Sequence, residues 1–524
     1  MSQNLLRIGV VSLATILSRV LGLLRDILTF AVFGTTALHS AFIFAFTLPN
    51  LFRRLLGEGS LNAALVPVYT DELQEKGKAR AWGLVNEVMS WLLLTSLLLC
   101  GLAILVFFLL PFWPGLPQRW YEGAELGKIL FPYLIFIALA AMVSAALNVL
   151  QRFAVPALSA VWLNLSILFF LGGAALWWGE TPGQKMGFLC AGVLFGGLLQ
   201  FLIPAWALYR EGWRPRLSFE GSARLRQVAL LMVPGLAGTA IFQINVVVSR
   251  MLAFSLDEAA VSLLYLANRL MELPLGVFAI AVATVIFPLL SRYASEANWA
   301  AMGSAYRRGL RLIFVVTIPA GVGLIVLREP IVTALFQWGA FGAESVRQTG
   351  PILAIFALSI PFYAWASFST RGFHSLKNTS TPVRIAGLSF LVNLACSLVF
   401  MRIWGTAGLA LANLCSMSGQ ALLLQLYLSR AQAELRVGRI WEDLLKILFA
   451  GGVMAGVLVW WPAFSQWIES EKWAAVVEVC LLVPLGILLY GLIVWALRLE
   501  GYKDLQQVLS KMVRPGPRQK GKGA

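Results

Sequence analysis

Arginines inside apolar sequence are the residues of this chain best suited to chemistry. Residues 18–59 contain four of them: Arg19, Arg25, Arg53 and Arg54. A charged side chain at membrane depth costs about 2.5 kcal/mol or more, so these side chains must face something other than lipid. They outnumber the nearby acids, Asp26 and Glu58. The surplus positive charge predicts a bound anion.

Because the cations are arginines, the sequence also indicates which kind of anion they would bind. A guanidinium donates two parallel hydrogen bonds and stays charged when water is removed, which suits phosphate groups. A cavity with three or four such groups fits a pyrophosphate, whereas it would repel a cationic drug. A later apolar segment adds Arg269, with Glu272 at i+3 as a restraint. The alternative is that these arginines reach the membrane surface or form structural ion pairs.

The neighbours of the arginines set their expected roles. If the first segment enters the membrane near residue 8, Arg19 lies about 16 Å deep, near the midplane. Asp26 is expected on the same face, with Arg25 beside it. Arg54 can pair with Glu58 at i+4, whereas Arg53 has no such neighbour and is the freer cation. Two polar residues of the seventh apolar segment could also line the cavity: Gln243 and Asn245.

Composition places these arginines in a membrane protein. The chain of 524 residues is 59% hydrophobic and 13% charged. In soluble proteins about half of the residues are apolar and about a quarter are charged. The net charge of +16 comes from basic residues in short loops, which indicates membrane orientation rather than nucleic-acid binding. The spacing of the cysteines and histidines fits no metal site, and we expect neither a metal nor a cofactor.

The elements that must position the arginines are membrane-spanning helices. At about 20 residues per span we expect about fourteen. They are residues 8–33, 38–69, 86–111, 128–150, 156–178, 186–209, 228–254, 259–291, 309–327, 347–370, 383–401, 405–429, 442–463 and 473–497. Spans 38–69 and 259–291 each contain two prolines, which predicts kinked or broken helices there.

A weak repeat predicts the domain organisation. Leu48-Pro49 followed by Pro67 resembles Leu273-Pro274 followed by Pro288, six spans later. The fold class expected is therefore an all-α polytopic membrane protein with two six-helix lobes and two C-terminal helices. The predicted parts are 1–220 (first lobe), 221–435 (second lobe), 436–500 (last two helices) and 501–524 (basic tail).

The loop charges predict the orientation. With the N-terminus in the cytoplasm, cytoplasmic loops hold roughly 28 Lys and Arg and outer loops hold roughly 7. An even number of spans returns the C-terminus to the cytoplasm. The basic tail is then expected near anionic membrane lipids.

Three motifs carry a resemblance to a known family: SRVLGLLRD from Ser18, LPNLFRRLLGEG from Leu48 with the following ALVPVY, and ANRLMELPLG from Ala267. Together they resemble the MurJ (MviN) lipid II flippases, which belong to the multidrug/oligosaccharidyl-lipid/polysaccharide exporter superfamily. The resemblance runs along nearly the whole chain.

That resemblance implies a function and a site. It implies a transporter of the bacterial inner membrane that moves lipid II, the undecaprenyl-pyrophosphate-linked peptidoglycan precursor, from the cytoplasmic to the periplasmic leaflet by alternating access. It assigns cavity roles to Arg19, Arg25, Arg53 and Arg269. It also implies a groove for the lipid tail in the last two helices. Cell-wall synthesis proteins are the protein partners that it suggests.

The chain departs from the family pattern at Ser40 and Asn268, where relatives often have Asp. It also has no Asp or Glu in the seventh and eleventh spans, where some relatives bind sodium. The energy source stays open among membrane potential, sodium, protons and removal of product. Two other functions stay open: export of another polyprenyl-linked glycan or a drug, and an integral-membrane enzyme acting on polyprenyl phosphates. Such an enzyme would need clustered acids, histidines or a metal.

Overall fold

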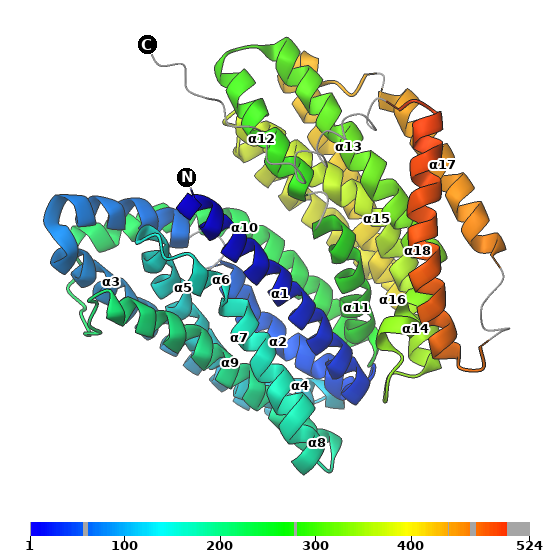
Figure 1. Cartoon of the computed structure of the whole chain (residues 1–524). Helices are drawn as coiled ribbons and strands as arrows, with labels where there is room; N and C mark the ends of the chain where they lie inside the picture. Colours follow the sequence, from blue (N-terminus) through cyan, green and yellow to red (C-terminus); the bar gives the residue numbers. More distant parts are fainter. Residues whose placement is uncertain (1, 56–60, 277–279, 439, 462–467, 500–524) are drawn as a thin grey trace. The chain divides into compact units, whose positions relative to one another are not determined.

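The computed structural model describes residues 2–55, 61–276, 280–438, 440–461 and 468–499. This described part of the chain is helical and contains no strand, in agreement with the predicted fold class (Figure 1). It forms two compact units. Unit 1 comprises Met1–Ser262 and Trp338–Gly342, and unit 2 comprises Leu263–Gln337 and Ala343–Ala524.

Unit 1 contains the first ten helices. They are α1 (Ser2–Phe33), α2 (Ala37–Leu55), α3 (Leu61–Leu109), α4 (Gln118–Leu130), α5 (Tyr133–Val149), α6 (Ala154–Ala157), α7 (Ser159–Phe169), α8 (Ala175–Trp178), α9 (Pro182–Arg210) and α10 (Ala223–Leu256). Buried apolar side chains of α3, α5 and α9 form its core, among them Leu65, Met142 and Leu208. Helix α1 lies along α7, where the Asn164 amide donates to the Ser18 carbonyl at 3.1 Å (Figure 1).

Two glycines divide long helical runs into separate helices. Gly77 in α3 has φ of 76°, and Gly405 in α16 (Ser380–Ala431) has φ of 56°. No atom of the described residues crowds a Cβ at either position, so the positive φ is the reason that these turns favour glycine. The part of α3 before Gly77 extends past the predicted span 38–69. Gly405 separates the predicted spans 383–401 and 405–429.

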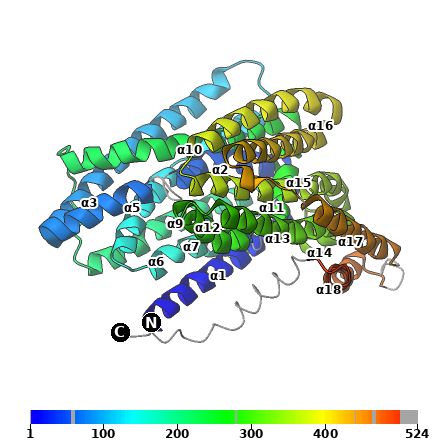
Figure 2. The ribbon, with the colours of Figure 1, turned by 90° about the horizontal axis from the view of Figure 1, so that it is seen from above.

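Unit 2 contains the remaining helices. They are α11 (Ala260–Pro274), α12 (Ile280–Ser295), α13 (Trp299–Val326), α14 (Arg328–Phe336), α15 (Ala343–Ser375), α16, α17 (Ile440–Trp460) and α18 (Glu471–Ala496), with the first residues of α11 in unit 1. Helices α17 and α18 lie side by side in Figures 1 and 2. They pack on α13 and α14, and the Tyr490 hydroxyl donates to the Val315 carbonyl at 2.9 Å.

The two C-terminal helices therefore share a core with unit 2. Arg311 of α13 holds Asp443 of α17 with an Nε to Oδ2 distance of 2.6 Å, and Ile447 and Met454 of α17 are buried in the same core. A concave apolar surface on α17 is lined by Val453, Gly456, Val457, Trp460 and Trp461.

The predicted spans are mostly helical where the structure describes them, with turns inside 128–150 and 156–178, and their number stays a prediction. Among the described residues eight helices are long and apolar enough to cross a membrane, or nine if α4 and α5, bent by 43°, count as one span. Helix α11 ends at Pro274 and π-helical residues 275–276 follow it, so the helical geometry changes at this proline. Residues 277–279 lie outside the described residues, and the break expected in 259–291 stays a prediction. The expected break in 38–69 and the tail 501–524 lie outside the described residues.

The compact units and the predicted lobes divide the chain at different places. Helix α10 groups with unit 1, whereas the sequence pattern assigned it to the second lobe, which was expected to start at residue 221. The lobes were defined by a repeat, and the compact units are defined by packing. The lobe boundaries therefore stay a prediction.

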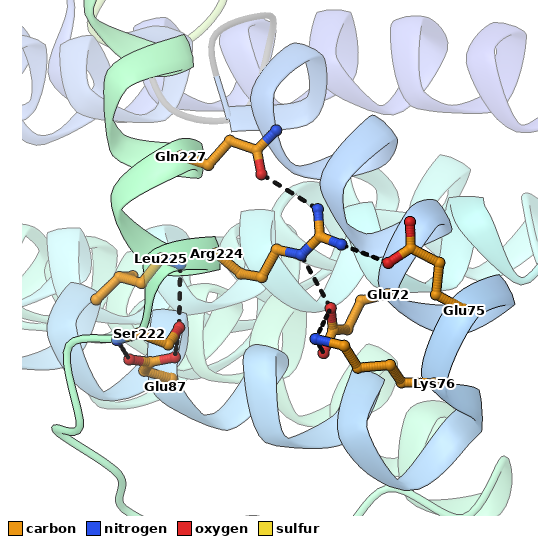
Figure 3. Close-up of polar contacts among 8 residues, drawn as sticks. All are labelled: Glu72, Glu75, Lys76, Glu87, Ser222, Arg224, Leu225 and Gln227. Carbon is orange, nitrogen blue, oxygen red and sulfur yellow. Dashed lines mark hydrogen bonds and ion pairs between the residues drawn. The ribbon is translucent and has the colours of Figure 1, made fainter.

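A polar clamp fixes the start of α10 against α3. Ser222 caps α10 through the Leu225 amide, and its own amide and hydroxyl each donate to a carboxylate oxygen of Glu87 at 2.5 Å. Arg224 donates to Glu72 at 3.0 Å and to Glu75 at 2.6 Å. Figure 3 shows these side chains converging from two stretches of α3. The turn at Gly77 lies between those stretches, which allows both to reach the segment 222–224.

Candidate substrate-binding site

On α1 the structure pairs one arginine and leaves another exposed. Arg25 donates from Nε and Nη2 to the same Asp26 oxygen, at 3.1 and 2.7 Å. Asp26 is 3% exposed, and a buried carboxylate needs such partners. Arg19 is exposed. Asp26 was expected on the face of Arg19, but the two side chains lie in different environments.

On α2 the side chain of Arg53 is oriented by an amide. Its Nε donates to Asn50 Oδ1 at 2.7 Å, across one helical turn. An amide oxygen orients a guanidinium but, being neutral, leaves its charge in place. The neighbouring Arg54 is half-buried. Its expected partner, Glu58, lies outside the described residues, so the Arg54–Glu58 pair stays a prediction.

A further arginine reaches α2 from α10. The Nη1 atom of Arg250 donates to the hydroxyl of Thr47. Thr47 is buried and Arg250 is half-buried. Arg250 therefore contacts the same helix that carries Arg53.

Unit 2 holds Arg269 beside a carboxylate. Nη1 of Arg269 lies 3.8 Å from Glu272 Oε2, and the Asn268 amide donates to Glu272 Oε1 at 3.0 Å. The expected i+3 restraint is present. Asn268, one of the two departures from the family pattern, shares the carboxylate with Arg269 and leaves the charge of Glu272 unchanged.

The other departure, Ser40, forms a neutral contact. Its hydroxyl lies 2.7 Å from that of Ser262, and both residues are fully buried. On α10, Gln243 is buried, and the Oδ1 atom of Asn245 is buried without a hydrogen-bond partner among the described residues. Asn245 therefore has an acceptor available for a donor from a ligand or water.

Sequence reasoning missed Arg250, Thr47 and Asn50. Arg250 lies within the expected span 228–254, so the rule that singled out Arg19 applies to it as well. Its place near the C-terminal end of the span also suits an arginine that reaches a membrane surface, and the sequence cannot separate these cases. Thr47 and Asn50 are common polar residues, and only the packing of α2 shows what they orient.

Comparisons with known proteins identify the family to which this chain belongs. The family model described as "Lipid II flippase MurJ" matches residues 30–478. The chain belongs to the MurJ family. A relative from Vibrio cholerae serotype O1, named "Probable lipid II flippase MurJ", is 31% identical over 96% of this chain and 98% of its own length. One from Bdellovibrio bacteriovorus with the same name is 32% identical over 84% and 85%.

Solved structures agree with the MurJ family assignment. A structure titled "Lipid II flippase MurJ, inward closed conformation" aligns with a TM-score of 0.76 and 26% identity, over 95% of this chain and 99% of that one. An inward-facing multidrug resistance MATE transporter of the MOP superfamily aligns with a TM-score of 0.63 and 14% identity. The second match concerns the fold alone. The chain is thus a polytopic membrane transporter rather than a catalytic enzyme.

Proposed function

We propose that this protein moves lipid II from the cytoplasmic to the periplasmic leaflet of the bacterial inner membrane. Membership of the MurJ family is the observation that carries the proposal. The arginines support it, because Arg25, Arg53 and Arg269 lie in helices of apolar sequence and lipid II carries a pyrophosphate. A guanidinium recognises that group with two parallel hydrogen bonds.

The transport mechanism we propose is alternating access. The headgroup enters a cavity open to the cytoplasm, and its pyrophosphate meets Arg19, Arg25, Arg53 and Arg269. Asp26, Arg54, Glu58 and Glu272 orient or balance these cations, and Gln243 and Asn245 contact polar parts of the headgroup. The lipid can shift the conformational equilibrium only if it binds the two states with different affinity.

The lipid tail is assigned to the C-terminal helices. The concave apolar surface of α17 offers Val453, Val457 and two tryptophans to a hydrocarbon chain. Its attachment to α13 through Arg311 and Asp443 keeps this surface on unit 2. We also propose that both termini are cytoplasmic and that cell-wall synthesis proteins receive the transported lipid.

A leaflet-accessibility assay tests the function. After depletion of this protein from cells, lipid II should be lost from the outer leaflet and accumulate in the inner one. Purified protein in liposomes should expose labelled lipid II to an external reagent without changing it chemically. A chemically altered lipid would favour the membrane-enzyme alternative. Movement of another polyprenyl-linked glycan but not of lipid II would favour the other exporter function.

A further inference from the structure

The linker between α9 and α10, residues 211–222, is attached to α3 by hydrogen bonds. The side-chain amide of Asn86 accepts from the Trp213 indole at 2.8 Å and donates to the Arg214 carbonyl at 3.0 Å. The same Asn86 oxygen accepts from the Arg216 backbone amide at 3.3 Å. These bonds give the linker a fixed path along α3, so the side chains that it carries start from fixed backbone positions.

One of these side chains, Arg214, is oriented by neutral groups. Its Cζ atom lies 3.8 Å from the centroid of the Tyr209 ring, in the last turn of α9. Its Nη1 atom donates to the Tyr209 carbonyl at 2.9 Å and to the Trp213 carbonyl at 3.0 Å. A ring face and neutral carbonyls hold a guanidinium in place without cancelling its charge.

The guanidinium of Arg214 keeps unused donors. Both of its hydrogen bonds start at Nη1, so Nε and Nη2 have no hydrogen-bond partner in the described part of the chain. Arg214 also forms no ion pair with a described residue. The edge formed by Nε and Nη2 carries two parallel N–H donors, which is the arrangement that binds two oxygens of one phosphate group. Arg214 is exposed, so a ligand outside the protein can reach it.

A second arginine near the linker also lacks a carboxylate partner. The Cζ atom of Arg210 lies 3.8 Å from the centroid of the Trp206 ring, and its guanidinium forms no ion pair among the residues that the structure describes. Arg152, in contrast, donates to Glu211 at 2.8 Å, and Arg224 is paired within the clamp. The positive charge of Arg210 and Arg214 is therefore left for a partner outside this chain.

Exposed apolar side chains of the linker indicate what kind of anion this is. Leu217 is 68% exposed and Phe219 is 49% exposed, and the Phe219 ring packs on Trp91 of α3 with a centroid distance of 5.7 Å. A soluble phosphate gains nothing from apolar surface, whereas a phospholipid has acyl chains next to its phosphate. The linker also lies on the predicted cytoplasmic side, where the membrane surface carries anionic lipids.

We propose that Arg214 binds the phosphate of an anionic phospholipid in the cytoplasmic leaflet. Tyr209 supports the guanidinium, and Arg210 adds positive charge at the end of α9. The bound lipid would attach the linker, which α3 already holds, to the membrane surface. This inference concerns a lipid that stays in its leaflet, and it does not depend on the function proposed above.

Titration of phosphatidylglycerol into the purified full-length protein, followed by native mass spectrometry, tests the inference. The same titration with phosphatidylcholine, which has no net headgroup charge, is the reference. Arg214→Gln should weaken binding of the first phosphatidylglycerol about 10-fold, equivalent to about 1.4 kcal/mol, and should change phosphatidylcholine binding much less. Arg214→Lys keeps the charge but loses the fork, so its affinity should lie between those of the wild type and Arg214→Gln.

The matched control is Arg226→Gln, at an exposed arginine in the first turn of α10. It removes the same charge from the same side of the protein and should bind both lipids as the wild type does. Equal losses of phosphatidylglycerol binding in Arg214→Gln and Arg226→Gln would mean that only the net charge matters, and would overturn the proposal.

A purely structural role for Arg214 gives a different pattern. Arg214→Gln would then lower the melting temperature of the lipid-free protein and leave the preference for phosphatidylglycerol over phosphatidylcholine at the wild-type value, which would overturn the proposal. Asn86→Ala loosens the linker but keeps Arg214. The binding role predicts that Asn86→Ala retains more of that preference than Arg214→Gln does.

Inorganic phosphate separates a lipid site from a site for a soluble anion. Added to the phosphatidylglycerol titration, it should not displace the lipid, and displacement would overturn the assignment to a phospholipid. Lipid II transport in liposomes is an independent measurement. If Arg214→Gln binds phosphatidylglycerol as the wild type does, this inference fails and the proposed function is unaffected.

Discussion

The polar clamp and the face of α2 use arginine in opposite ways. In the clamp, Arg224 donates to carboxylate oxygens of Glu72 and Glu75, and Lys76 lies 3.2 Å from Glu72. At α2, Arg53 donates to the amide oxygen of Asn50, and Arg250 of α10 donates to the hydroxyl of Thr47. Carboxylates cancel the charge of a guanidinium, whereas neutral oxygens only orient it.

Carboxylate partners mark the cation of the clamp as structural, whereas the cations at α2 have neutral oxygens among their partners. In the clamp, the carboxylate of Glu87, which is 4% exposed, accepts hydrogen bonds from Ser222, the cap of α10. The charged groups and hydrogen-bond donors of the clamp therefore have partners inside the protein. Removing a clamp residue should therefore cost stability. Removing an α2 residue should cost recognition of an anion. Each prediction below tests one side of this comparison.

The largest effect is expected at Arg53. Arg53→Ala removes an oriented cation from the α2 face and should abolish lipid II transport in liposomes. Arg54→Ala is the matched control on the same helix and should be milder, because Glu58 can neutralise Arg54 locally. Equal loss in both variants at equal protein abundance would show that the local environment does not distinguish these arginines.

A large effect is also expected at Arg269. Losing a charge-assisted hydrogen bond costs about 2–3 kcal/mol, so Arg269→Ala should weaken lipid II binding by roughly 30- to 150-fold. Arg269→Lys keeps the charge but loses the fork and should retain partial transport. The measurement is fluorescence binding to purified protein. Unchanged affinity and transport in Arg269→Ala would restrict phosphate recognition to the arginines of unit 1.

An intermediate effect is expected at Asn50. Asn50→Ala removes the acceptor that orients Arg53 but keeps the cation. At about 1 kcal/mol for such a hydrogen bond, binding of lipid II should weaken roughly 5-fold. Thermal unfolding without lipid should be nearly unchanged. A loss as large as that of Arg53→Ala would mean that Asn50 itself contacts the lipid.

The smallest effect on binding is expected at the clamp. Glu87→Ala leaves the amide and hydroxyl of Ser222 without their buried acceptor and should lower the free energy of unfolding by about 1–3 kcal/mol. Lipid II affinity should stay at the wild-type value at a temperature where the variant is folded. The control is Glu220→Ala, at an exposed glutamate of the same segment. A stable Glu87→Ala variant with weakened binding would reverse the roles assigned to the two regions.

Much of the fold could be predicted from the sequence, because it depends on local signals. A long apolar run must become a helix in a membrane, where each backbone group needs a partner within its own segment. Prolines and glycines mark where such helices end, as Pro274 and Gly405 do here. Arg269 and Glu272 are three residues apart, so helix geometry alone predicts their contact.

The contacts between distant segments could not be predicted in the same way. From the sequence, segment 210–226 is predicted only to be a basic loop that sets the membrane orientation. In the structure its Arg224 forms ion pairs with two carboxylates of α3. Arg250 and Thr47 lie 203 positions apart. Neither pairing leaves a periodic pattern or a short motif.

The sequence by itself determined that this is an all-helical membrane protein of the MurJ type with cations inside its apolar helices. Hydrophobicity and helix geometry act over a few residues, so they can be read along the chain. Only the tertiary structure decided which partner each cation has. A hydroxyl, an amide and a carboxylate all lie within reach of arginines here, and helix packing selects among them. That selection distinguishes the cations of the clamp from those that we assign to the transported lipid.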